Sequence, residues 1–93
     1  MKHLRGQLLD FLKRIYPNEI EELGIISVFY EYHRDKEIRQ SLQYLVDKGY
    51  AEKRNAKHPF RKREKLTFYK ITAKGIDLLE GTIEDMGVIL EEE

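Results

Sequence analysis

The chain has 93 residues and carries 17 basic and 17 acidic side chains, so its formal net charge is zero. This length is enough for one small domain and too short for two independent hydrophobic cores. The absence of cysteine excludes disulfide bridges, thiolate zinc sites and cysteine nucleophiles. No apolar run approaches the roughly 18 residues needed to cross a bilayer, and no apolar signal-peptide core follows Lys2 and Arg5. We therefore expect a soluble, cytoplasmic protein.

The charges are segregated along the chain. Basic side chains dominate from Lys53 to Lys65, where Glu64 is the single carboxylate, whereas the residues from Ile76 onward carry acidic side chains and neither lysine nor arginine. Such segregation produces a local positive field despite the net charge of zero. The composition is therefore compatible with a polyanionic partner for the basic stretch.

The first predicted helix runs from about Lys2 to about Tyr16. Pro17 disfavours helical geometry at the residue before it and so ends the element. Leu9 and Tyr16 widen the apolar stripe, which is expected either to extend the core or to contact a second subunit. The apolar side chains at helical spacing are Leu4, Leu8, Phe11, Leu12 and Ile15.

The segment that follows is also expected to be helical. Asn18 followed by Glu21 resembles a capping arrangement, so a short helical piece is predicted over residues 19–23, ending at Gly24. A second helix is predicted over residues 25–33. The β-branched and aromatic residues there favour a strand by intrinsic propensity, but helix is preferred because the next element needs a packing partner. Its core-facing side chains are expected to be Ile26, Phe29 and Tyr30.

The clearest helical pattern lies between Asp35 and Gly49. Asp35 can cap the amino end of this helix with its carboxylate, and Gly49 supplies the left-handed residue that ends it. The apolar face, at i, i+4, i+7 and i+8, consists of Ile38, Leu42, Leu45 and Val46. The opposite, polar face consists of Lys36, Arg39, Gln40 and Gln43.

Two β-rich runs, residues 50–54 and 66–72, flank a basic loop and predict a hairpin. Thr72 is a natural cap for a further helix over residues 73–80, which Gly81 would end. The apolar side chains of that helix that are expected to pack on the first helix are Ile76 and Leu79, with Leu78 as a further candidate.

The domain is expected to span residues 1–81. Residues 82–93 are acidic and contain two small capping residues, Thr82 and Asp85, followed by Gly87. We expect this segment to be a short turn and a loosely held tail. The tail is interpreted as solubilising charge, with folding over the basic loop as the alternative.

These elements carry a family resemblance. A leucine-bearing helix ends in the motif DKGYAE at residues 47–52, and a charged loop and then the motif ITAKG at residues 71–75 follow it. In this order, the three parts resemble the end of the recognition helix, the wing and the next helix of winged helix-turn-helix proteins. The resemblance implies an α+β fold, a small domain with three helices, a two-stranded β wing and a C-terminal helix.

The order of elements resembles that of MarR-like and ArsR-like regulators. The chain lacks the cysteine ligands of metal-sensing members, no effector pocket is evident, and no cofactor is implied. The stretch ITAKGIDLLEGTIEDMGV also resembles small phage-encoded winged-helix proteins, which implies a mobile-element origin. The resemblance implies sequence-specific binding of double-stranded DNA by a homodimeric transcriptional regulator, with repression expected ahead of activation. The first and last helices would be the dimer surface.

The polar face of the 35–49 helix is the expected reading surface. A helix with its side chains fits the major groove of B-DNA, where Arg pairs bidentately with guanine and Gln with adenine. Arg39, Gln40 and Gln43 are expected to contact base edges, and Lys36 a phosphate at the amino end. The alternative is a solvated face, because these residues are also good helix formers.

The basic hairpin is expected to contact phosphates or the adjacent minor groove. Pro59 and Phe60 are expected to stiffen its loop or to form an apolar tip. The alternative is a loop kept soluble by its charge, although clustered cations repel one another without a polyanion. The residues expected to contact DNA here are Arg54, Lys57, His58, Arg61, Lys62, Arg63 and Lys65.

Other functions have less support in the sequence. The main alternative is a winged-helix module that binds protein, with its basic wing on an acidic partner; an RNA-binding wing would need an aromatic single-strand platform that is not evident. His3, His33 and His58 lack the spacing of a metal site. There is no phosphate-binding glycine loop or nucleophile elbow, so we expect no enzyme. The aromatic residues expected to serve core or dimer packing are Tyr30, Tyr32, Tyr44, Tyr50, Phe68 and Tyr69.

Overall fold

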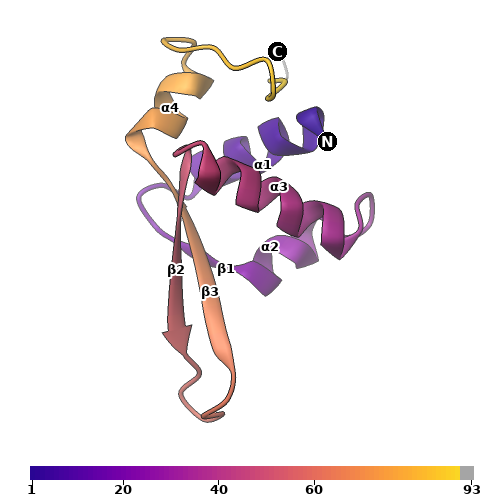
Figure 1. Cartoon of the computed structure of the whole chain (residues 1–93), viewed down its shortest axis with the longest axis vertical. Coiled ribbons are helices and arrows are strands. Elements are labelled where there is room, and N and C mark those ends of the chain that lie inside the picture. Colours follow the sequence, from indigo (N-terminus) through magenta and orange to yellow (C-terminus); the bar gives the residue numbers. More distant parts are fainter. Residues whose placement is uncertain (91–93) are drawn as a thin grey trace.

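The computed structural model describes residues 1–90 and confirms the α+β class. Helices gather into one body, and a hairpin projects from it as a wing (Figure 1). The sheet is antiparallel with the strand order β1-β3-β2. The elements in chain order are α1 (Lys2–Arg14), β1 (Ile20–Glu21), α2 (Glu22–Phe29), α3 (Asp35–Asp47), β2 (Ala51–Lys57), β3 (Lys65–Ile71) and α4 (Ala73–Leu79).

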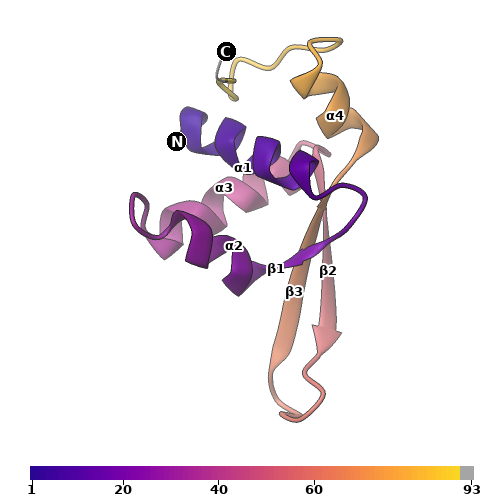
Figure 2. The ribbon, with the colours of Figure 1, turned by 180° about the vertical axis from the view of Figure 1, so that it is seen from behind.

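The core forms where the apolar faces of the helices meet one end of the sheet. Viewed from behind, α1 lies across α3 and covers its inner side (Figure 2). Leu9 is fully buried, so the widened stripe of α1 belongs to the core of its own chain, whereas Tyr16 is exposed. The core side chains contributed by α1, α2 and α3 are Leu4, Leu8, Leu9, Leu12, Ile25, Ile38, Leu42 and Leu45.

Helix α3 has the predicted apolar face and the predicted end. Gly49 adopts the left-handed conformation with φ 81°, which a residue with a side chain rarely adopts. The expected cap at Asp35 is wrong: the helix begins at Asp35 itself, and Arg34 is the extended N-cap residue, without a capping side-chain hydrogen bond. In the first turn, the carboxylates of Asp35 and Glu37 still complement the positive end of the helix dipole.

The predicted helical piece over residues 19–23 is also wrong. Ile20 and Glu21 form β1, which pairs with Tyr69 and Phe68 of β3. The Glu21 carboxylate then caps α2 by accepting hydrogen bonds from the N–H groups of residues 23 and 24, at 2.6 and 3.3 Å. The expected cap at Asn18 is therefore wrong as well: Glu21 itself is the N-cap residue, and it begins α2. Ile20 and Glu21 form a strand because they pair with β3, which lies far away in the sequence.

Helix α2 consequently begins and ends earlier than predicted. It contains Gly24, which was expected to break a helix, and ends at Phe29. The core side chain is Ile25, whereas Ile26 and Phe29 are partly buried and Tyr30 is 63% exposed. The prediction of Tyr30 as a core residue is therefore wrong, because the earlier end of α2 leaves Tyr30 at its solvent-facing C-cap.

The wing is longer than the sequence pattern predicts. Strand β2 reaches Lys57, and its register with β3 runs from the pair Ala51–Ile71 to the pair Lys57–Lys65. The chain therefore has an extent of 42 Å along its longest axis. Thr72 caps α4 as predicted, since its hydroxyl accepts a hydrogen bond from the Gly75 N–H at 3.1 Å.

Residues 82–90 are not the loosely held segment that we expected. Val88 is buried, and the Arg5 guanidinium donates a hydrogen bond to the Gly87 carbonyl at 3.0 Å. The Ile89 N–H donates to the Lys2 carbonyl at 3.1 Å. This segment lies at the end of the molecule opposite the wing tip, so it does not fold over the basic loop (Figure 1). The remainder of the predicted tail, 91–93, lies outside the described residues.

Candidate nucleic-acid interface

The polar face of α3 contains two kinds of side chain. The side chains of Lys36 and Gln40 are exposed, and they form no hydrogen bond or ion pair with any residue in the described range 1–90. Gln43 is held in place: its amide donates to Asp47 at 2.8 Å, and its amide oxygen accepts from Lys53 at 3.4 Å. Gln43 therefore connects α3 to the wing.

Arg39 is engaged by a carboxylate of α2. Its Nε donates to Glu22 at 2.9 Å, and the Tyr69 hydroxyl donates to the other oxygen of Glu22 at 2.9 Å. Burial, and then this hydrogen bond, raise the pKa of Tyr69 above its ordinary value. Glu22 thus joins α2, α3 and β3, and Arg39 orients α3 in addition to presenting a guanidinium that is half exposed.

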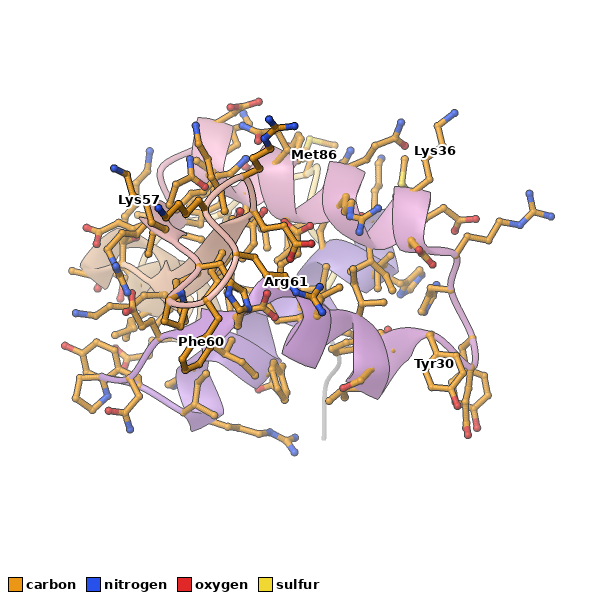
Figure 3. All side chains as sticks on the ribbon, turned by 90° about the horizontal axis from the view of Figure 1, so that it is seen from below. Tyr30, Lys36, Lys57, Phe60, Arg61 and Met86 are labelled. Atoms are coloured by element: carbon orange, nitrogen blue, oxygen red, sulfur yellow. The ribbon has the colours of Figure 1, made fainter. Side chains whose placement is uncertain are left out.

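The wing has two faces because successive side chains of a strand point to opposite sides. One face meets the helical body: Lys53 reaches Gln43 of α3, and Tyr69 reaches Glu22 of α2. We call it the helix-side face. The register shows which cationic side chains belong to it: Lys53, Lys57 and Lys65. Figure 3 shows Lys36 and Lys57 on the α3 side of the molecule.

The structure does not bring Arg54 together with these cations. Arg54 lies on the opposite face of the wing, where its guanidinium forms an ion pair with Glu19 and stacks 4.6 Å over the Phe68 ring. The hydrogen bond with Glu19 raises the pKa of Arg54 and lowers that of Glu19. Lys53 was missing from the residues expected to contact DNA, although the two-residue period back from Lys57 was the signal that could have found it.

The tip of the wing is an ordered loop. The His58 N–H donates to the Glu64 carbonyl at 3.0 Å, and the Glu64 N–H donates to the Arg61 carbonyl at 3.1 Å. Arg61 also pairs with the Glu64 carboxylate at 3.1 Å. Lys62 and Arg63 are exposed and form no ion pair within the part of the chain that the structure describes.

Three further features bear on ligands. In residues 1–90, no group of three or more His, Asp or Glu side chains is arranged to hold a metal ion. Within the same range, each helix is too short or too polar to cross a membrane. A groove of about 620 Å³ lies between α1 and α2, away from the polar face of α3, and its apolar lining includes Phe11, Phe29 and Leu90.

The order of the elements and the projecting hairpin give the chain a winged helix-turn-helix fold. No family model and no curated protein matches the chain. Among solved structures, the chain is similar to PadR of Bacillus subtilis, in a crystal structure with operator DNA, with a TM-score of 0.64 and 18% sequence identity over 97% of this chain and 54% of the PadR chain. The chain thus spans about half the length of that PadR chain, and the likeness is one of fold.

Proposed function

We propose that the protein binds double-stranded DNA sequence-specifically as a transcriptional regulator, and more specifically as a repressor. The observation that supports this most directly is the continuity between the polar face of α3 and the helix-side face of the wing, through Gln43 and Lys53. A helix beside a cationic hairpin can occupy the major groove while the hairpin follows the neighbouring backbone. PadR of Bacillus subtilis, which shares the fold, has been crystallised with operator DNA.

Within this proposal, the residues of α3 have different roles. Gln40 contacts a base edge, where a carboxamide can pair bidentately with adenine. Gln43 does so once its carboxamide releases Asp47 and Lys53. Lys36 contacts a phosphate at the amino end. Arg39 either releases Glu22 and contacts a base, or stays bound to Glu22 and fixes the angle of α3. In both cases, replacing Arg39 impairs the discrimination between DNA sequences.

The cations of the wing contribute affinity more than sequence choice, because phosphate contacts do not depend on the base. Two groups of cations contact the DNA backbone or enter the adjacent minor groove. They are Lys53, Lys57 and Lys65 on the helix-side face, and Arg61, Lys62 and Arg63 at the tip. His58 orders the tip, and Arg54 acts on the opposite face by holding Glu19.

The decisive test is fluorescence anisotropy of labelled duplex DNA across a salt series. Replacing Arg61, Lys62 and Arg63 by alanine removes up to three phosphate contacts, so the slope of log affinity against log salt should flatten by up to about 2.7. The matched control replaces Lys13 and Arg14 of α1 and Lys70 on the opposite face of the wing, which removes the same charge away from the proposed interface. Its slope should stay close to that of the wild type.

Equal flattening in both variants would show a general charge effect and contradict the proposed interface. If the wild type fails to bind even at low salt, the basic wing is better explained as a surface for an acidic protein partner.

We also propose that the protein acts as a homodimer, because two α3 helices on two half-sites multiply specificity. The candidate surface is where the start of α1 and residues 82–90 meet. Three apolar side chains are exposed in this part of the fold: Met1, Met86 and Ile89. Sedimentation velocity of the wild type and of Met86→Lys tests this proposal, since the charged variant should shift towards the monomer.

A further inference from the structure

Phe60 occupies an unusual position for a large apolar side chain. It lies at the far end of the wing, where 90% of its surface is exposed. In the view along the wing, Phe60 and Arg61 lie together at the tip (Figure 3). Its only aromatic neighbour in the described residues is His58, whose ring centroid is 6.3 Å away in an edge-on arrangement. Packing within its own chain therefore does not account for this side chain.

The backbone that carries Phe60 is held in one shape. The Nδ1 atom of His58 accepts two hydrogen bonds, from the N–H groups of Phe60 and Arg61, each at 3.1 Å. On the other side, the turn from Arg61 to Glu64 and its ion pair close the loop. Pro59 restricts the backbone further. The ring is thus presented in advance, so little conformational entropy is lost when a partner covers it.

Cationic residues flank Phe60 along the chain. Arg61, Lys62 and Arg63 follow it directly in the chain, and Lys57 and Lys65 form the pair at the base of the loop. A cationic loop with an apolar tip matches the minor groove of a duplex, where phosphates line the two walls and the floor consists of base and sugar edges. The cations can reach the walls while the ring reaches the floor.

We propose that Phe60 is an apolar wedge that enters the minor groove and partly opens a base step, so that the wing reads the deformability of DNA. This rests on the proposed function. Unstacking costs least at flexible pyrimidine–purine steps and most in stiff adenine tracts. Phe60 is therefore a specificity-determining residue that acts without hydrogen bonds to bases.

The test uses two labelled duplexes of about 30 base pairs, one of alternating adenine and thymine and one with all adenines on one strand. The wild type should bind the alternating duplex more tightly. Phe60→Ala should lower affinity for that duplex about tenfold and remove the preference, while Phe60→Leu should retain much of both. The salt slope should stay unchanged, because no phosphate contact is lost.

The matched control is Tyr32→Ala, which removes another exposed ring, one that is 83% exposed and lies just after α2. It should leave both affinities unchanged. Neither side chain supports the core, so circular dichroism should show the same folded state for all variants.

Three outcomes would overturn the wedge. If Phe60→Ala binds both duplexes like the wild type, the wedge fails and the proposed function stands. If the wild type binds neither duplex at low salt, both fail together. If the wild type binds phosphatidylserine vesicles, and Phe60→Ala no longer binds them but still binds both duplexes normally, the tip is a membrane contact.

Discussion

At the scale of single residues, Asp85 links the C-terminal segment to the start of the wing. Its carboxylate accepts hydrogen bonds from the Tyr50 hydroxyl at 2.6 Å and from the Gly87 N–H at 2.7 Å. Lys48 lies 3.8 Å away. The bond from Tyr50 is the main cause that holds the pKa of Asp85 below its ordinary value, whereas burial raises the pKa of Tyr50 to about 12.

Asp85→Ala should lower the free energy of unfolding by about 2 kcal/mol at neutral pH, because hydrogen bonds to a partly buried carboxylate are lost. The pKa of Asp85 is lower in the folded state, so its contribution is present above the unfolded pKa. It is lost as pH falls through the folded value. The difference between wild type and variant should therefore shrink below about pH 4.

Urea unfolding followed by circular dichroism at several pH values measures this difference. Glu84→Ala, an exposed neighbour of the same charge, is the control and should have little effect. If the free energies of unfolding of the wild type and of Asp85→Ala differ by the same amount down to about pH 2, the side chain stabilises the fold through packing and its charge does not contribute.

At the scale of elements, the two faces of the wing should differ in their contribution to DNA binding. Lys53→Gln with Lys57→Gln removes two charges from the helix-side face, and should flatten the salt slope by up to about 1.8. Arg54→Gln with Lys70→Gln removes two charges from the opposite face, where Arg54 is bound to Glu19. That pair should change the slope much less.

Anisotropy of one labelled duplex across a salt series measures both pairs. Both pairs remove two positive charges from the wing, so the comparison holds the change in net charge constant and varies the face. Equal slopes for the two pairs would mean that the wing does not present one face to DNA, and would remove Lys53 from the interface.

At the scale of the whole molecule, the C-terminal segment closes the end of the fold opposite the wing tip (Figure 1). Gly6 of α1 allows this close approach, because a Cβ atom there would lie 2.0 Å from the Ile89 carbonyl oxygen. The segment thus crosses α1 at a position that accepts only glycine. Its hydrogen bonds join it both to α1 and to Tyr50, the residue before β2.

Gly6→Ala should therefore act in opposite directions in two chains. In the full chain it should lower the free energy of unfolding by about 2 kcal/mol, because the clash displaces Val88 from the core. In a chain that ends at Gly81, the same change should stabilise by up to about 1 kcal/mol, since alanine is the better helix former. Thermal unfolding of the four proteins measures both effects; the same sign in both chains would contradict the proposed packing.

The elements whose causes are local could be predicted from the sequence. Apolar periodicity located the buried face of α3 at Ile38, Leu42 and Leu45, and the backbone preference of glycine located its end at Gly49. The hydroxyl of Thr72 located the start of α4. Together with the order of parts, these signals were sufficient for the winged helix-turn-helix fold, because each depends on residues within a few positions of one another.

The contacts between distant parts of the chain could not be predicted in this way and are seen in the folded structure alone. Pairing with β3 made Ile20 and Glu21 a strand, and the strand register separated Arg54 from the cations that face α3. The bond between Glu22 and Arg39 and the burial of Val88 also join residues that are far apart in sequence. No local pattern encodes such contacts, because they depend on which surfaces meet once the core has formed.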